Sequence, residues 1–254
     1  MITLSLIGIG TGNPGHITLA AVRALNHADL ILLPRKGEAK SDLIDLRRLL
    51  CDQLLEQPAS AKIVEFDLPR RDNRSHYLSA VDDWHTKIAE VWAQLMDQQL
   101  PNGGKVGMLI WGDPSLYDSS LRIVQRLRHS GRPVKVQVVP GITSLQVLTA
   151  EHQIPLNALA EPVQITTGRR LRERGWPSDA ATVAVMLDSG GAFTTLPSED
   201  TYIWWGAYLG MEKQCLMKGW LGEVGAEIIE QRAALREAHG WIMDIYLLAK
   251  RPLL

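Results

Sequence analysis

The hydrophobic pattern of residues 1–151 alternates short β-rich runs with longer segments of helical period. Apolar and β-branched runs predict strands at residues 3–9, 30–33, 62–66, 106–111 and 134–139. Apolar positions at helical spacing predict helices near residues 17–28, 42–55, 77–98, 119–129 and 143–151. Because strands that alternate with helices are typical of a parallel sheet covered by helices, we predict a five-stranded, mostly parallel, doubly wound α/β sheet.

The pattern changes near residues 154–162, where Pro155 and Pro162 bracket a segment without a clear period, which indicates a linker. Beyond it, strands are predicted at residues 163–166, 182–187, 202–207, 214–219 and 241–249, with one strong helix near residues 223–238. Fewer crossover helices mean more antiparallel pairing. We therefore predict an N-terminal α/β domain at residues 1–157 and a C-terminal mixed α+β domain at residues 158–254.

Composition narrows the choice of partners. A chain of 254 residues with 46% hydrophobic content can bury the cores of two domains. Its formal charge of −1 creates no field that would favour nucleic acid or an anionic membrane surface. Cys51 and Cys215 stand far apart and outside any CxxC pair, so we predict no metal or disulfide framework and interpret both as small buried hydrophobes.

The first residues form a short apolar run without a basic leader, unlike a signal peptide. No apolar run approaches the ~18 residues that a membrane helix needs. We therefore expect a cytoplasmic protein.

A glycine-rich loop follows the first predicted strand and satisfies GxGxxG at Gly10, Gly12 and Gly15. A dinucleotide site would also need an acidic residue at the end of the second strand. Asp29 comes before that strand, and the basic pair Arg35 and Lys36 follows it. This pair suits a phosphate or carboxylate better than a ribose hydroxyl, so the motif is weak evidence for a nicotinamide oxidoreductase.

Two more glycine-containing loops follow predicted strands, at residues 112–114 (Gly-Asp-Pro) and 140–142 (Pro-Gly-Ile). Each of these two sequences alone is common in ordinary turns. All three loops, however, leave the carboxyl ends of parallel strands, and ligands bind at that edge of open α/β sheets. Together they predict a ligand site.

In order and spacing these loops resemble the tetrapyrrole methylase family, whose pattern is a glycine-rich loop followed by a Leu-Thr-like pair, then Gly-Asp-Pro, then Pro-Gly-Ile. Here Ile17, Thr18 and Leu19 follow the first loop. Within the family the chain is most similar to the members that act on precorrin-5, through residues 36–43, 202–210 and 239–246. It lacks the Arg-Ala-Thr segment that uroporphyrinogen methylases often carry in place of residues 205–207.

The resemblance implies an S-adenosylmethionine-dependent C-methyltransferase of cobalamin biosynthesis. Methylation at carbon 1 of precorrin-5, with loss of acetate, would give precorrin-6A. It also implies a homodimer, with the cofactor in a cleft completed by the C-terminal domain. Methylation at another position of a precorrin remains an alternative, as do, less favoured, a tetrapyrrole-binding protein without turnover and the oxidoreductase.

By the same resemblance, cofactor contacts fall on the loops after the fourth and fifth strands and on the C-terminal domain. The implied cofactor-binding residues are Pro14, Trp111, Gly112, Asp113, Leu116, Thr143, Ser144, Met186, Leu187 and Ala207. The first loop, with Gly10 and Gly12, would face the tetrapyrrole instead.

Methyl transfer from a sulfonium needs chiefly alignment of donor and acceptor, so no triad or metal is required. Loss of acetate could use a base, and Asp113, His16 and Asp244 are candidates. A solvent-facing His16 is favoured over a base, and an exposed or structural Asp244 is at least as compatible with the sequence as a base, so no catalytic residue is assigned.

The carboxylate side chains of a corrin precursor call for guanidinium groups. Arg35 and Arg70 follow the second and third strands at the ligand edge and are our candidates for substrate binding. Further basic residues stand nearby or in the second domain: Lys36, Arg71, Arg74, Arg169, Arg170, Arg172 and Arg174. The last four favour a solvated helix face. Of the adjacent Trp204 and Trp205, at most one can face a ligand.

Overall fold

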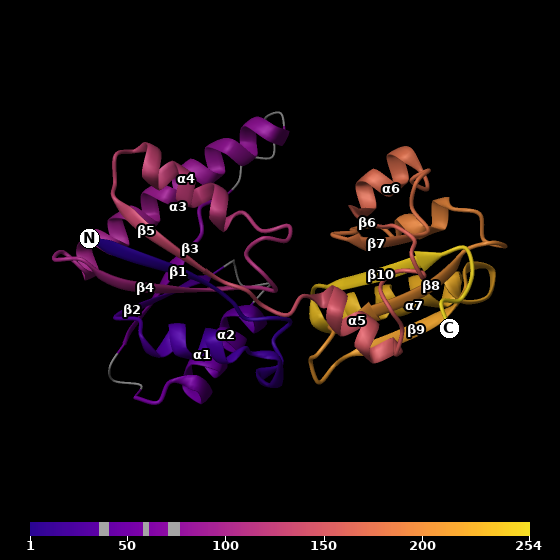
Figure 1. Ribbon diagram of the computed structural model, residues 1–254, viewed down its shortest axis with the longest axis horizontal. Helices are drawn as coiled ribbons and strands as arrows, with labels where there is room; N and C mark the ends of the chain where they lie inside the picture. Colours follow the sequence, from indigo (N-terminus) through magenta and orange to yellow (C-terminus); the bar gives the residue numbers. More distant parts are fainter. Residues whose placement is uncertain (36–40, 58–60, 71–76) are drawn as a thin grey trace. The chain divides into compact units, whose positions relative to one another are not determined.

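Figure 1 shows a computed structural model of the protein. It describes residues 1–35, 41–57, 61–70 and 77–254. The chain forms two compact units, Met1–Ile142 (unit 1) and Thr143–Leu254 (unit 2). Each unit has its own sheet, as the sequence predicts.

The division between the units lies earlier than the boundary expected after residue 157. Helix α5 (Ser144–His152) packs against strands β8 (Tyr202–Ala207) and β10 (Asp244–Ala249), which belong to unit 2. The buried Leu145 and Leu148 provide its apolar face. This packing places α5 with the second sheet, and the irregular segment that we interpreted as the linker lies inside unit 2.

The sheet of unit 1 contains five parallel strands, which confirms the predicted doubly wound architecture. In chain order they are β1 (Ile2–Gly8), β2 (Leu30–Arg35), β3 (Lys62–Asp67), β4 (Gly104–Ile110) and β5 (Val134–Val139). Their order in the sheet is β3-β2-β4-β1-β5. The carboxyl ends of β1, β4 and β5 are therefore neighbours, and the three glycine-containing loops begin there.

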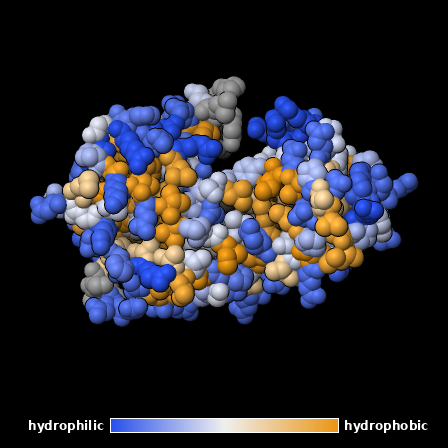
Figure 2. Space-filling view, viewed as in Figure 1, coloured by the Kyte–Doolittle hydropathy of each residue, from blue (hydrophilic) through white to orange (hydrophobic). Residues whose placement is uncertain are grey.

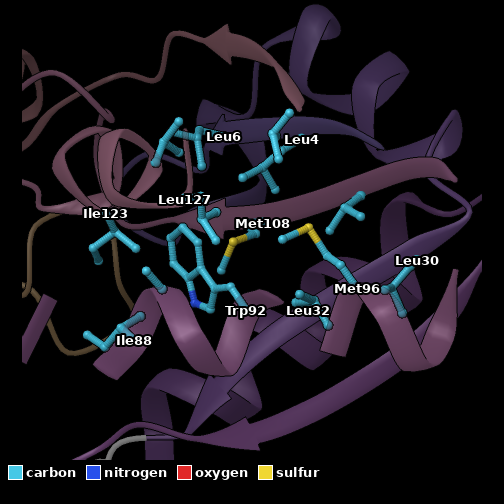
Figure 3. Close-up of a cluster of buried hydrophobic side chains, with 14 of the residues drawn as sticks. Leu4, Leu6, Leu30, Leu32, Ile88, Trp92, Met96, Met108, Ile123 and Leu127 are labelled. Atoms are coloured by element: carbon cyan, nitrogen blue, oxygen red, sulfur yellow. The ribbon is translucent and has the colours of Figure 1, made fainter. Parts of the chain in front are cut away.

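Helices cover both faces of this sheet (Figure 1). They are α1 (Leu19–Asn26), α2 (Ser41–Leu54), α3 (Tyr77–Gln99) and α4 (Ser120–His129), with a short 3-10 helix η1 (Pro14–His16) before α1. Because side chains alternate along a strand, Leu4 and Leu6 of β1 pack with α3 and α4, as Figure 3 shows. Ile7 joins the cluster on the side of α1 and α2.

The sheet of unit 2 is mixed and has the order β6-β7-β10-β8-β9. Its remaining strands are β6 (Val163–Thr167), β7 (Thr182–Met186) and β9 (Cys215–Trp220). Only β6 and β7 pair in parallel, whereas β7–β10, β10–β8 and β8–β9 are antiparallel. This confirms the predicted mixed sheet.

Helix α7 (Leu221–His239) is the strong helix predicted in unit 2. The structure adds α6 (Gly168–Arg174) and the 3-10 helix η3 (Ala192–Thr195), which are too short to show a clear period in the sequence. None of the helices in the described part of the chain is long and apolar enough to cross a membrane.

Candidate functional site

The three glycine-containing loops of unit 1 contact one another through their backbones. Gly10 and Gly112 form an isolated antiparallel bridge, with the amide of each donating to the carbonyl of the other at 3.2 and 2.7 Å. A methyl group on Gly141 would overlap Gly112 O and the backbone of Gly8. Glycine is therefore required at Gly8 and Gly141 for close approach, and the loops form one rigid edge.

Asp113 joins the second and third loops. Its Oδ2 accepts a hydrogen bond from Gly141 N at 2.9 Å, and its Oδ1 accepts from Ser115 N at 2.8 Å and from Ser115 Oγ. Burial of Asp113 opposes ionisation, but these hydrogen bonds outweigh it and hold the pKa below the ordinary value. The carboxylate of Asp113 is thus ionised and is a weak proton acceptor. We call its hydrogen bonds to the second and third loops the Asp113 clasp.

Gly112 leaves space for a ligand. Its φ of 67° lies in the left-handed region, and a Cβ built on it would meet nothing within 4 Å. Trp111 and Leu116, on either side of the Asp113 clasp, are half-buried. The loop therefore presents backbone to open space, which an approaching cofactor requires.

The first loop contains two buried polar atoms that find no hydrogen-bond partner among the described residues, Thr11 Oγ1 and His16 Nδ1. Buried polar groups are nearly always paired, so such atoms need an explanation, and an absent ligand is one. The loop is otherwise well ordered by local bonds: Asn13 Oδ1 accepts from Gly15 N at 2.8 Å, and the exposed Pro14 begins η1. The sequence analysis did not identify Thr11, because only the glycines beside it belong to a recognisable motif.

Thr143 and Ser144 begin α5. Thr143 forms a capping box with Gln146, in which its hydroxyl accepts from Leu145 N at 3.2 Å and Gln146 Oε1 accepts from Thr143 N at 3.0 Å. The Thr143 side chain is thus engaged in the cap, while Ser144 is half-buried in the first turn. The cap fixes the backbone that follows the third loop.

A strained turn ends β7. Leu187 has a φ of 52°, unusual for a leucine, and its side chain is 65% exposed, while Met186 is half-buried. Strained backbone persists where surrounding structure enforces it, often at functional sites. Ala207, at the end of β8, is fully buried and pairs with Asp244 and Cys215 on the flanking strands.

Asp188 enforces the turn. Its Oδ2 accepts from Tyr246 Oη at 2.7 Å and Ala192 N at 2.5 Å, and its Oδ1 accepts from Gly190 N at 3.1 Å and Arg172 Nη2 at 3.2 Å. Burial of Asp188 raises its pKa, but the hydrogen bonds more than offset this, so the pKa lies below the ordinary value. Sequence reasoning missed this residue, because a lone aspartate after a strand resembles ordinary turn chemistry.

Asp244 belongs to a buried ion pair. Its carboxylate accepts from Arg232 Nε at 2.7 Å, Arg232 Nη2 at 3.2 Å and Trp205 Nε1 at 2.8 Å. Arg232 Nη2 also donates to Asp188 O at 2.8 Å. Both carboxylate oxygens are occupied, so the structural interpretation of Asp244 fits better than a role as base. Trp204 and Trp205 are both core residues, at 2% and 0% exposure.

Arg35 already has acidic partners. Its Nε and Nη2 donate to the two oxygens of Asp67 at 3.0 and 2.9 Å, and Glu65 lies 3.9 Å away. Arg70 is exposed beyond β3. The arginines of α6 are exposed, and Figure 2 shows hydrophilic residues gathered over this helix. Lys36, Arg71 and Arg74 lie outside the described residues.

Sequence reasoning also missed Arg47, which stands on the otherwise apolar face of α2 between Ile44 and Leu50. Its Nε donates to Leu109 O at 3.2 Å and its Nη1 to Leu43 O at 3.0 Å. Helical spacing could have identified it, because positions 43, 44, 47, 50 and 51 share one face of the helix. The neighbouring Arg48 is exposed and pairs with Glu65 and Asp45.

The two cysteines differ in burial. Cys51 is fully buried, and burial raises the pKa of its thiol to about 11. Cys215 is only half-buried, so the predicted burial holds fully for Cys51 alone. Within the described ranges, no three His, Cys, Asp or Glu side chains gather where they could hold a metal ion.

Comparison with known proteins gives matches over nearly the whole chain. The sequence model of the Tetrapyrrole (Corrin/Porphyrin) Methylases matches residues 3–225. A protein from Sinorhizobium sp. described as precorrin-6A synthase [deacetylating] is 46% identical over 247 residues, which cover 96% of this chain and 94% of that protein.

Solved structures agree with these matches. A cobalamin synthesis related protein (CobF) from Corynebacterium diphtheriae is 41% identical and superposes with a TM-score of 0.85, covering 98% of this chain and 99% of that one. Uroporphyrin-III C-methyl transferase from Thermus thermophilus, solved in complex with S-adenyl homocysteine, has a TM-score of 0.59 at 19% identity, covering 98% and 97% of the two chains. At that identity the likeness concerns the fold alone.

Proposed function

Since the chain belongs to the tetrapyrrole (corrin/porphyrin) methylase family, we propose that it is a precorrin-6A synthase. It transfers a methyl group to carbon 1 of precorrin-5, and water attacks the carbonyl of the acetyl unit, which leaves as acetate, as a step of cobalamin biosynthesis. The observation that carries this assignment is the near full-length match, at 46% identity, to the Sinorhizobium protein of that description. The nicotinamide alternative has no comparable support, because β2 ends in Arg35 instead of an acidic residue.

The residues of unit 1 fit S-adenosylmethionine as cofactor. Gly112 offers open space before its backbone, and the Asp113 clasp fixes that backbone against the third loop. We assign cofactor contacts to five residues of unit 1, Pro14, Trp111, Gly112, Asp113 and Leu116, and to five of unit 2, Thr143, Ser144, Met186, Leu187 and Ala207. The cofactor supplies an electrophilic methyl group, whereas the chain supplies position.

Positioning accounts for most of the catalysis that these residues perform. The three loops are joined backbone to backbone, and the β7 turn is held by Asp188, so little reorganisation accompanies the reaction. Of the three candidate bases, Asp113 and Asp244 use both carboxylate oxygens in hydrogen bonds. We assign the role of base in deacetylation to His16, whose Nδ1 has no hydrogen-bond partner in the described part of the chain.

We assign Gly10 and Gly12 of the first loop to the tetrapyrrole, together with Arg35 and Arg70. Arg35 would exchange its exposed pairing with Asp67 for a substrate carboxylate, at small cost because exposed ion pairs contribute little. We further propose a homodimer that acts in the cytoplasm.

The proposal is tested by incubating the protein with precorrin-5 and S-adenosylmethionine. S-adenosylhomocysteine and acetate are quantified together by mass spectrometry, and equal amounts of both are expected. S-adenosylhomocysteine without acetate would instead assign methylation at another ring position. If folded protein and intact substrate give neither product, the result would favour a tetrapyrrole-binding protein without turnover.

A further inference from the structure

Unit 1 contains a cavity of about 240 Å³ at the carboxyl edge of its sheet, which we call the Arg47 cavity. Pro34 of β2, Ile110 of β4 and Trp111 mark its position at the ligand edge. The wall formed by the core includes Ile88 and Trp92, which Figure 3 shows side by side on α3. Apart from a few polar groups, the lining is apolar.

Arg47 is the cation of this cavity. Its two hydrogen bonds go to the backbone carbonyls of Leu109 and Leu43, which fix the guanidinium without neutralising it. Asp118 also lines the cavity, but its Oδ1 accepts from Ser120 N at 2.7 Å, and no ion pair joins it to Arg47. Among the described residues no carboxylate forms an ion pair with Arg47, and Asp118 acts on it only through its charge.

The electrostatics favour an anion. Burial lowers the pKa of Arg47 to about 10, although the charge of Asp118 acts to raise it. The side chain still carries its charge at neutral pH, but that charge is incompletely compensated. Because a half-buried charge without a direct ion pair is incompletely stabilised, a carboxylate that enters the cavity gains a charge-assisted hydrogen bond with Arg47.

Size and lining define the rest of the ligand. A site for a whole small molecule usually occupies roughly 300–1,000 Å³, so a cavity of about 240 Å³ is too small for a macrocycle. It has room for a short aliphatic chain, and Leu43 and Ile44 offer apolar contacts for methylene groups.

We propose that the Arg47 cavity binds a short aliphatic carboxylate, with the guanidinium of Arg47 as its partner. The inference rests on the proposed function, which provides two sources for this group: an acetate or propionate side chain of the tetrapyrrole, and the acetate that is released. Arg47 thus adds a substrate-recognition residue to the exposed Arg35 and Arg70.

The test compares Arg47→Gln with Arg48→Gln, the adjacent exposed arginine on the same helix. Loss of a hydrogen bond between charged groups should raise the KM for precorrin-5 about tenfold or more in Arg47→Gln. The affinity for S-adenosylmethionine should stay at the wild-type value in both variants. Arg48→Gln should also keep the wild-type KM.

Inhibition of the wild-type protein by acetate, with neutral acetamide as control, identifies the source of the carboxylate. A raised KM assigns the cavity to a side chain of the substrate. An unchanged KM with loss of acetate inhibition in Arg47→Gln assigns it to released acetate. If Arg47→Gln does not fold, inhibition of the wild type by acetate but not by acetamide, competitive with precorrin-5, supports the proposal.

An unchanged KM in Arg47→Gln, with acetate no more inhibitory than acetamide, overturns the inference. If only the wild type can be measured, inhibition by acetate that is no stronger than inhibition by acetamide overturns the inference. Turnover of precorrin-5 by the wild type is scored separately, so failure of the cavity proposal is distinguishable from failure of the proposed function.

Discussion

The carboxylate of Asp113 accepts a hydrogen bond from the backbone amide of Gly141, 28 residues further along the chain, at 2.9 Å. This bond ties the loop after β4 to the loop after β5. Together with the bridge between Gly10 and Gly112, it makes three separate loops a single preorganised surface.

Asp113→Ala removes the clasp and leaves Gly141 N without its partner. We expect the affinity for S-adenosylmethionine to fall about tenfold or more, since hydrogen bonds to charged groups contribute about 1.5–3 kcal/mol. Isothermal titration calorimetry measures the change. Asp97→Ala, which removes an exposed partner of Arg132, is the matched control. Unchanged affinity in a folded Asp113→Ala would contradict the assignment.

Gly141→Ala tests the close approach of the loops. Its methyl group would overlap Gly112 O and the Gly8 backbone, which cannot move without breaking the sheet edge. We expect the free energy of unfolding in urea to fall by about 3 kcal/mol. Gly240→Ala, at a left-handed helix end with open space, should cost only about 1 kcal/mol. Equal losses in the two variants would argue against the crowding.

Arg232→Met tests the buried ion pair of unit 2. The change leaves the Asp244 carboxylate buried without its cation, so the free energy of unfolding should fall by about 3–5 kcal/mol. Arg132→Met, which breaks the exposed pair with Asp97, should cost at most about 1 kcal/mol. Urea denaturation measures both. A cost for Arg232→Met as small as for the control would mean that Asp244 is solvated and available as a base.

Asp188→Asn tests the pH dependence of the β7 turn. The folded pKa of Asp188 lies below its ordinary value of 3.8. The stabilisation of the folded state by ionised Asp188 is therefore complete at pH values above 3.8. It is lost as the pH falls through the pKa of Asp188 in the folded protein. The stability difference between wild type and Asp188→Asn should thus shrink below about pH 4.

Chemical denaturation from neutral to acidic pH measures that difference. Asp200→Asn, which removes an exposed partner of Lys250, should differ little from wild type throughout. A difference for Asp188→Asn that stays constant down to pH values well below the folded pKa would contradict the ionised state of this carboxylate.

Most of the fold could be predicted because it follows from hydrophobic period. The runs that form β1 to β5 and the helices between them have the lengths and spacing of a doubly wound sheet. The boundary between units could not be predicted, because it depends on which sheet α5 packs against. Leu148 of α5 lies beside Gly206 of β8, and this contact between residues distant in sequence assigns the helix to unit 2.

The loops of the site could also be predicted, since glycines after parallel strands define the ligand edge. The partners of individual side chains could not. Arg35 was a natural candidate for a substrate carboxylate, but Asp67, on the neighbouring strand β3, already binds it. Helical spacing places Arg47 on the apolar face of α2, but its contact with Leu109 O and the hydrogen bonds of Asp188 join residues distant in sequence, which local motifs do not show.

The most direct test of the central claim locates the transferred methyl group. Precorrin-5 is incubated with the protein and S-adenosylmethionine labelled with carbon-13 in its methyl group, and the product is examined by NMR spectroscopy. We predict a labelled methyl on carbon 1 of the ring and one molecule of acetate for each labelled product. Label on any other ring carbon, or label on carbon 1 without acetate, would contradict the assignment as a deacetylating precorrin-6A synthase.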